Sequence, residues 1–397
     1  MMRFLQTQEQ LDFRKKARIW LADNLPDEWR HVGKAVRPEM KEDVAIHLAW
    51  ERKLFEHGWV GLHWPKHHGG QGLGLFEHLI FQEELGLSGA PEGLNGMGRE
   101  LVGPILMKLG TPEQQSRYLR NILAGKEIWC QGFSEPNAGS DLGAMRTRAT
   151  RVSDGWCIDG QKVWTSYAAH ADLCLLLARV AEGQSPRGHI AMFILPMNTK
   201  GVQIRPIEQI HAKKEFCEVF LNSVILPEDA LIGTVEGGWR GAAEVLGVER
   251  GANKLYRQAS FVAELRSIQR YKRAHSSVLA PHVSSAFDAR IGELYGQLSL
   301  VRYRNFALVG AMQRGEQPGH STSAHKLYWT EVHQDACELG LDVLTAVGHV
   351  SGSQDTDVQR LMYAYFSSRA ETIFAGTSQI QRDILAQRVL ELPRAKA

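Results

Sequence analysis

The stretch that decides the fold is QGFSEPNAGSDLGAMRTRA, Gln131 to Ala149, which follows the apolar run IWC. It carries the Ser134 hydroxyl and then the small residues Ala138, Gly139 and Ser140. Small side chains leave backbone amides free to approach a planar or phosphate-bearing ligand closely. The stretch therefore indicates a ligand-binding segment that begins where a strand ends.

Two further segments support this interpretation. DGQKVWTSYA, Asp159 to Ala168, is a turn followed by a strand that ends in Trp-Thr-Ser, and an indole followed by two hydroxyls can stack on a flat ring and bond its heteroatoms. FAGTSQIQRDILAQRVLELPR, Phe374 to Arg394, is a Gly-Thr turn that leads into a helical pattern. Taken alone, a strand-end Trp is usually core and a GTS turn usually caps a helix. The three segments together, in this order, are far more specific.

The surrounding chain changes character twice. Between about 126 and 232 the apolar runs are short, β-rich and bounded by Gly and Asp turns, which is typical of a sandwich or barrel. Before and after this region the apolar spacing is helical, and the last part is typical of an antiparallel bundle. We therefore predict a mainly α protein with a central β-domain, in three domains at 1–126, 127–235 and 236–397.

Local signals in the first third predict individual elements. Thr7 and Gln10 form a capping-box pattern ahead of a helix. Helical patterns cover about 41–57 and 75–87. The glycines and proline of WPKHHGGQGLG, Trp64 to Gly74, are expected to exclude regular structure there.

Composition excludes several classes of protein. The 397 residues include 46 Lys and Arg against 44 Asp and Glu, a formal charge of +2, which gives no electrostatic footprint for nucleic acid or an anionic membrane. No apolar run approaches the roughly 20 residues of a membrane span, and the first 20 residues lack a signal-peptide pattern. The five cysteines are scattered and odd in number, which favours a reducing compartment. We expect a soluble, cytoplasmic protein.

Common catalytic motifs are absent from the sequence. It contains no GxGxxG after a strand, no Walker A motif, no GxSxG and no HExxH. The glycines of 69–74 are interpreted as a structural turn. His63, His67 and His68 have no carboxylate nearby in the sequence and are interpreted as solvent or capping histidines, so no metal is expected.

With these segments in place, the chain resembles the acyl-CoA dehydrogenase family of flavoproteins. The resemblance runs over nearly the full length, from the N-terminal helical patterns and the loop at 64–74 to the terminal segment at 374–394. It implies an all-helical first domain, a middle β-domain and a C-terminal four-helix bundle. It also implies FAD as the cofactor, bound without a dinucleotide-binding motif.

The resemblance assigns cofactor-binding roles to residues of the β-domain. Gln131, Phe133 and Ser134 are expected at the pyrimidine end of the flavin ring, mainly through backbone amides and the Ser134 hydroxyl. Ser140 matches a serine near the cofactor pyrophosphate and the acyl-CoA. Trp164 matches a tryptophan that lies against the flavin.

The same resemblance assigns four further contacts. Thr165 and Ser166 follow the tryptophan, and Ser166 stands where the family places a hydroxyl near flavin N5. Thr377 and Gln379 match a pair that contacts FAD after the Gly-Thr turn.

The main departure from the family is Ala375, because the commonest pattern has the catalytic glutamate at this position. The backbone N–H of Ala375, beside Gly376, keeps the contact to the thioester carbonyl that the family uses. A minority of relatives place the base on the helix that opens the C-terminal domain, just before an arginine. In the matching segment GVERGAN we therefore predict Glu249 as the base and Arg250 as a substrate-side contact; the alternative is an exposed helical Glu-Arg pair.

A second departure concerns the ADP end of the cofactor. Many relatives carry an Arg-x-x-Phe-Gly element there, whereas this chain has RYKRAHSSVLAPHV, Arg270 to Val283, which is expected to link two helices. The Gly-Gly turn of many relatives is LTAVGHV, Leu344 to Val350, in this chain. How the adenine half is held stays open.

The resemblance implies α,β-dehydrogenation of an acyl-CoA thioester to a 2-enoyl-CoA, on a branched or bulky acyl chain because Ala375 enlarges the pocket. The implied partners are the acyl-CoA, an electron-transfer flavoprotein or similar acceptor, and further subunits in a homo-oligomer (dimer or tetramer) or a hetero-oligomer. Two alternatives stay open. One is a partner subunit without its own activity, and the other is an acyl-CoA oxidase or flavin monooxygenase of the same fold.

Overall fold

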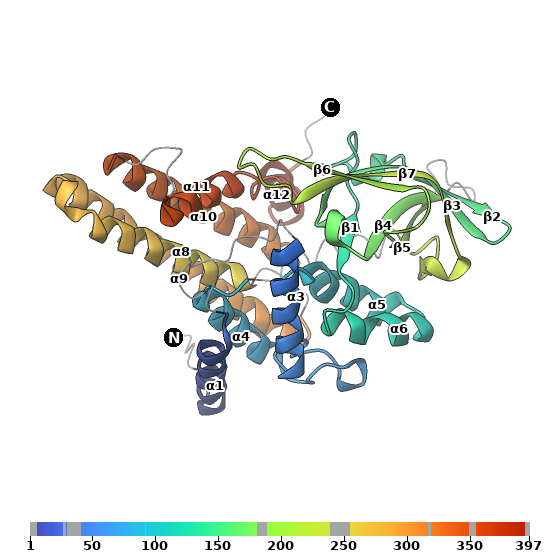
Figure 1. The fold of residues 1–397 in the computed structure, drawn as a ribbon, viewed down its shortest axis with the longest axis horizontal. Helices are drawn as coiled ribbons and strands as arrows, with labels where there is room; N and C mark the ends of the chain where they lie inside the picture. Colours follow the sequence, from blue (N-terminus) through green and yellow to red (C-terminus); the bar gives the residue numbers. More distant parts are fainter. Residues whose placement is uncertain are drawn as a thin grey trace. The chain divides into compact units, whose positions relative to one another are not determined.

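The computed structural model describes residues 6–26, 29, 41–91, 93–180, 189–238, 255–316, 319–348 and 355–393. Its helices flank a β-sheet region along the chain, so the predicted mainly α fold with a central β-domain is confirmed. The chain forms two compact units, which the colours of Figure 1 help to follow along the sequence. The three domain ranges given above stay a prediction.

The first unit is helical and comprises 1–36, 73–92 and 249–397. The predicted capping box is confirmed, because the Thr7 side chain accepts from the Gln10 N–H and Gln10 accepts in return. Four helices, α8 to α11, pack side by side around a core that includes Leu265, Leu298 and Leu339 (Figure 1). The helices of this unit are α1 (Gln8–Asn24), α4 (Leu75–Ser88), α8 (Leu255–Ala274), α9 (Pro281–Gln313), α10 (Ser321–Ala346), α11 (Thr356–Ser368) and α12 (Ser378–Arg388).

The expected linker between two helices is also confirmed. Helix α8 ends at Ala274, a short 3₁₀ turn covers Ser276–Val278, and Pro281 opens α9. Proline suits the first helical position, since its missing N–H has no helical partner there in any case.

The second unit comprises 37–72 and 93–248 and holds the sheet. Its helices are α3 (Lys41–Glu56), α5 (Gly103–Leu109) and α6 (Pro112–Leu123), and a π-helical turn at Gly98–Val102 precedes α5. Its strands are β1 (Trp129–Gly132), β2 (Arg148–Val152), β3 (Gly155–Ser166), β4 (Leu173–Val180), β5 (His189–Pro196), β6 (Val202–Ile207), β7 (Phe216–Leu226) and β8 (Leu231–Ile232).

The strands form one sheet in the order β6-β7-β3-β2-β4-β5-β8, and β1 pairs in parallel with β4. Strand β4 is buried along nearly its whole length, as expected for the apolar run LCLLLARV. Trp156 and Phe193 meet edge to face in the sheet core, with ring centroids 5.3 Å apart. The sheet therefore gives β1 and β3, the strands of the two predicted flavin segments, a rigid common support.

The loop Trp64–Gly74 is more ordered than expected. Residues Lys66–His68 form a 3₁₀ turn, so the prediction that regular structure is excluded there was wrong. Close packing explains the glycine at position 70, because a Cβ on Gly70 would lie 2.3 Å from the carbonyl oxygen of Trp64. His63 is half-buried, and burial lowers the pKa of its ring to about 4.

Across the described ranges, no helix is both long enough and apolar enough to cross a membrane.

Candidate functional site

Trp164 lies at the end of β3, where the β3–β7 pairing shifts register between Lys162 and Thr165. Its backbone is left-handed, with φ of 60°, which is unusual for a bulky side chain. The bulge turns the indole outward, and its side chain is 58% exposed with one edge against the Phe216 ring. An aromatic face held out by strained backbone is suited to stacking on a planar ligand.

Thr165 and Ser166 differ in accessibility. Thr165 is fully buried, and among the described residues its Oγ1 has no hydrogen-bond partner. Ser166 is half-buried. The next residue, Tyr167, is again left-handed with φ of 57°, and its N–H donates to the Glu215 carbonyl. The Trp-Thr-Ser end of β3 is thus fixed on both sides.

Strand β1 leads into the first predicted flavin segment. Gln131 is half-buried and pairs with Leu175 of β4. The Phe133 ring is buried, so only its backbone is available to a ligand. Ser134 is half-buried, and its carbonyl accepts from the Val163 N–H at 2.9 Å, one residue before Trp164. This bond joins the two predicted flavin segments directly.

A buried ion pair locks the same junction. Lys162 Nζ donates to Glu135 Oε1 at 2.8 Å and to the Phe133 carbonyl at 3.2 Å. Glu135 also accepts from the backbone N–H groups of Arg146 and Thr147, at 2.5 and 2.9 Å. Because both side chains are almost completely buried, removing either one leaves an uncompensated charge.

The two members of the pair respond differently to burial. Burial alone would raise the pKa of Glu135, but the Lys162 charge and the hydrogen bonds to Glu135 outweigh it and lower this pKa. For Lys162 the loss of water outweighs the attraction of Glu135, and its pKa is lowered. The carboxylate is therefore ionised near neutral pH and holds its backbone partners.

Ser140 follows a tight turn in which Glu135 and Ala138 exchange backbone hydrogen bonds at 3.0 and 3.1 Å. Ser140 is exposed, and a Cβ placed on the neighbouring Gly139 would meet nothing within 4 Å. The segment therefore leaves open space beside the Ser140 backbone.

The third segment forms a tight turn ahead of α12. Ala375 and Gly376 are both left-handed, with φ of 53° and 89°. The carbonyls of both residues accept from Gln381 Nε2 at 3.2 Å, and the Gly376 carbonyl also accepts from Lys326 Nζ at 2.7 Å. Gln381 and Lys326 are buried. With its carbonyls held on one side, the turn has a fixed orientation.

The Ala375 N–H has no hydrogen-bond partner within the described part of the chain. The use of that amide as a donor to a ligand carbonyl stays a prediction. Thr377 is the N-cap of α12, and its Oγ1 accepts from the Ile380 N–H at 3.2 Å. A hydroxyl that accepts in a cap can still donate its proton, so capping and ligand binding are compatible. Gln379 is exposed.

Glu249 and Arg250, predicted as the base and the substrate-side contact, lie outside the described residues. The other predicted site residues fall in two groups. One group is built on β1, the turn after it and β3, and the other on the turn before α12.

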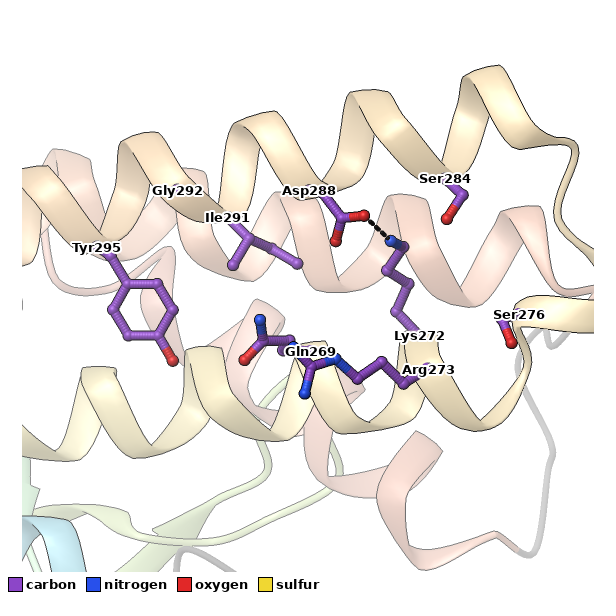
Figure 2. A pocket seen from close by; sticks show the side chains of 9 residues that line it. All are labelled: Gln269, Lys272, Arg273, Ser276, Ser284, Asp288, Ile291, Gly292 and Tyr295. Atoms are coloured by element: carbon purple, nitrogen blue, oxygen red, sulfur yellow. Dashed lines mark ion pairs between the residues drawn. The ribbon is translucent and has the colours of Figure 1, made fainter.

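A groove of about 580 Å³ runs between α8 and α9, at the stretch that replaces the Arg-x-x-Phe-Gly element (Figure 2). Lys272 is nearly buried and pairs with Asp288 at 2.6 Å. Arg273 and Ser276 also line the groove. This stretch therefore lines the groove with polar side chains, and the charge of one of them, Lys272, is already neutralised by Asp288.

Sequence reasoning missed the residues that hold the site in shape, namely Glu135, Lys162, Lys326 and Gln381. Glu135 and Lys162 lie inside the quoted segments, and a charge inside a strand pattern was the available signal. Lys326 is 50 residues from Gly376, and nothing in the sequence pairs them.

Comparison with known proteins identifies the family of the chain. Family models for the acyl-CoA dehydrogenase N-terminal, middle and C-terminal domains match residues 7–126, 130–224 and 236–390. The chain is 38% identical to the acyl-CoA dehydrogenase IpdE1 of Mycobacterium tuberculosis, over 96% of this chain and 98% of that protein.

Two solved structures are also similar. One is the Tcur3481-Tcur3483 steroid ACAD, with a TM-score of 0.86, 27% identity and coverage of 99% of this chain and 100% of that chain. The other is the ChsE4-ChsE5 complex of M. tuberculosis, with a TM-score of 0.83, 27% identity and full coverage of both chains. The chain belongs to the acyl-CoA dehydrogenase family of flavin-dependent oxidoreductases.

Proposed function

We propose that the protein catalyses FAD-dependent α,β-dehydrogenation of a bulky acyl-CoA thioester to the 2-enoyl-CoA. The observation that carries this proposal is the turn before α12. Its Ala375 N–H has no partner among the described residues, while Gln381 and Lys326 fix the carbonyls beside it. A fixed amide donor polarises a thioester carbonyl and so acidifies the α-carbon, which is the first requirement of the reaction.

The residues around β3 fit a flavin. Trp164 offers an exposed aromatic face, and Thr165 has a buried hydroxyl oxygen without a partner among the described residues. Gln131, Ser134, Ser140 and Ser166, with Thr377 and Gln379 of the other group, complete the proposed cofactor contacts. FAD, when bound, supplies the acceptor for the β-hydrogen, which leaves as a hydride.

The chain must also supply a base. Ala375 has no ionisable side chain, so we assign removal of the α-proton to Glu249 and a contact on the CoA side to Arg250. This assignment is supported by the GVERGAN segment and its match to the minority family pattern.

The proposed substrate is a branched or ring-bearing acyl group. Alanine at 375 leaves space that a glutamate would fill, and Gly376 adds no side chain. One similar structure is named a steroid ACAD, which supports a ring-bearing substrate. The proposed place is lipid degradation, with an electron-transfer flavoprotein or similar acceptor reoxidising the enzyme.

We also propose that the protein works as an oligomer. A mainly apolar depression on α9 and α10 is lined by Leu300, Tyr303, Arg304, Ala307 and Tyr328, of which Leu300 is 54% and Tyr303 42% exposed. An exposed apolar surface of this kind suits contact with another subunit. A homo-oligomer and a hetero-oligomer both fit, and one similar structure is described as a two-protein complex.

The experiment is anaerobic mixing of the purified chain with straight, branched and ring-bearing acyl-CoA thioesters, followed by the flavin absorbance. The proposal predicts a flavin-containing protein that is bleached by a bulky thioester. It also predicts that Glu249→Gln keeps FAD and slows bleaching by about 10²-fold or more, as for loss of a general base. The control Glu244→Gln, five residues earlier in the sequence, is expected to behave like the wild type.

Other results would replace the proposal. A folded but colourless chain would favour the partner-subunit alternative. Rapid oxygen consumption without any electron acceptor would favour an oxidase or monooxygenase. Bleaching of Glu249→Gln at the wild-type rate would exclude Glu249 as the base.

A further inference from the structure

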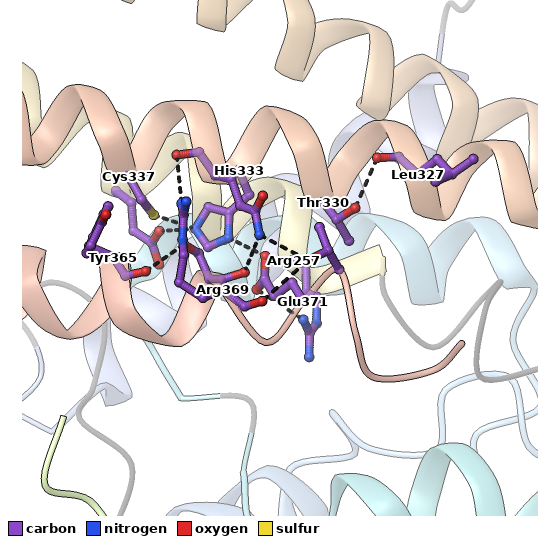
Figure 3. Close-up of polar contacts among 12 residues, drawn as sticks. Arg257, Leu327, Thr330, His333, Cys337, Tyr365, Arg369 and Glu371 are labelled. Atoms are coloured by element: carbon purple, nitrogen blue, oxygen red, sulfur yellow. Dashed lines mark hydrogen bonds and ion pairs between the residues drawn. The ribbon is translucent and has the colours of Figure 1, made fainter. Parts of the chain in front are cut away.

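The core of the helical bundle contains a cluster of polar groups that the proposed reaction does not use. His333 and Cys337 lie four residues apart on α10, so their side chains share one face of the helix. Glu264 reaches them from α8, and Glu371 from the turn after α11. All four residues are buried. Figure 3 shows His333, Cys337 and Glu371 converging between the helices.

Three atoms of this cluster converge as metal ligands do. His333 Nε2 lies 2.7 Å from Glu264 Oε2 and 3.4 Å from Cys337 Sγ, and the three atoms all lie within 4.8 Å of one another. At zinc bond lengths of about 2.0–2.3 Å, tetrahedral ligand atoms stand roughly 3.3–3.6 Å apart. The distance from His333 Nε2 to Cys337 Sγ, 3.4 Å, already lies in this range. The distance from His333 Nε2 to Glu264 Oε2, 2.7 Å, would have to increase by roughly 0.6 Å.

The other ring nitrogen of His333 is oriented as in known metal sites. His333 Nδ1 lies 2.6 Å from Glu371 Oε2, and Arg257 pairs with the other oxygen of Glu371 at 3.3 Å. A metal-binding histidine almost always donates its second N–H to a carboxylate or carbonyl, which fixes the tautomer. Phe261 stacks on the imidazole, with centroids 3.6 Å apart and planes inclined by 11°. The ring is therefore held for coordination through Nε2.

We propose that His333 Nε2, Cys337 Sγ and Glu264 form a binding site for a divalent transition-metal ion of the zinc type, supported by Glu371. One nitrogen, one sulfur and one oxygen ligand match the preferences of Zn²⁺ and of Co²⁺, whereas Mg²⁺ and Ca²⁺ require oxygen ligands. The ion would cross-link α8 and α10 inside the bundle, and its three protein ligands leave a fourth position for water or another group. It does not depend on the proposed dehydrogenase chemistry.

Both ring nitrogens of His333 face carboxylates, Nδ1 that of Glu371 and Nε2 that of Glu264. A metal ion binds a thiolate and a free ring nitrogen, so binding is expected to release protons, at most about two per ion.

The test uses the full-length, untagged chain with the cofactor it carries. Co²⁺ is added, and the difference spectrum is recorded at wavelengths beyond the flavin bands, together with the protons released. We expect saturation at about one ion per chain with release of protons, at most about two per ion, and tetrahedral Co²⁺ bands. Metal analysis of protein grown with zinc is expected to find a similar content.

The variants separate a metal site from a purely structural ion cluster. Cys337→Ala removes a ligand and Cys337→Ser keeps its volume, whereas Cys174→Ala changes another buried free cysteine in the sheet unit. Glu371→Gln is expected to weaken binding by roughly 10–100-fold, as for loss of a supporting carboxylate, and each Cys337 variant by more. Cys174→Ala is expected to bind like the wild type.

Absence of saturable Co²⁺ and Zn²⁺ binding in the wild-type chain would overturn the proposal and leave a hydrogen-bonded cluster without a metal. Equal binding by the Cys337→Ser and wild-type proteins would overturn it as well.

Discussion

Replacing Lys162 by methionine tests whether the buried ion pair holds the two proposed flavin segments together. The change keeps the length of the side chain and removes its charge, and it leaves Glu135 buried without its cation. It also removes the bond to the Phe133 carbonyl. Removing one partner of a buried pair costs about 3–5 kcal/mol of the free energy of unfolding.

The matched control is Lys214→Met, in the same unit. Lys214 pairs with Glu208 at 3.4 Å, but the two side chains are 58% and 65% exposed. An exposed pair contributes about 0–1 kcal/mol. The contrast between the two variants therefore isolates burial from the loss of a lysine.

The assay is urea unfolding followed by circular dichroism, with FAD retention measured on the same samples. We expect Lys162→Met to be less stable than Lys214→Met by at least about 2 kcal/mol, the difference between the two ranges above, and to retain less FAD. Equal stability of the two variants would refute the proposed role of this pair.

Three further predictions concern the same groups. Trp164→Ala should leave the free energy of unfolding within about 1 kcal/mol of wild type, because the side chain is exposed and its left-handed backbone is strained. The variant should bind FAD more weakly in a titration. Wild-type affinity for FAD would contradict the stacking role of Trp164. The pKa of Glu135 is lower in the folded protein than in the unfolded chain, where it is about 4.5. Ionised Glu135 therefore stabilises the fold above pH 4.5, and this stabilisation is lost as the pH falls through the pKa of the folded protein. The stability gap between wild type and Glu135→Gln should therefore narrow below about pH 4.5, and a gap that widens in acid would contradict it. Lys326→Met should release the Gly376 carbonyl and lower kcat more than it weakens FAD binding, whereas unchanged kcat would show that the turn needs no such support.

The sequence predicted the elements well where one local signal decides. The capping box at Thr7, the apolar run of β4 and the helix after Thr377 all depend on neighbouring residues. The loop at 64–74 was misjudged because turn residues also permit a 3₁₀ turn, and its close packing against Trp64 comes from folding.

The sequence singled out the segments of the candidate site, but not the residues that hold those segments in shape. Motifs identified the Trp164 and Ala375 segments, but not the left-handed backbone of either residue. The contact of Lys326 with Gly376 and the convergence of Glu264 on His333 join residues 50 and 69 positions apart, and only the packed bundle brings them together.

The most direct test of the proposed reaction is product analysis in a single anaerobic turnover. The flavin-loaded chain is mixed with a ring-bearing acyl-CoA thioester, and the enoyl product is quantified by mass spectrometry against the flavin that is bleached. The proposal predicts one equivalent of 2-enoyl-CoA, lighter than the substrate by two hydrogens, for each flavin bleached. Flavin that stays oxidised with every thioester, or bleaching without an enoyl product, would contradict it.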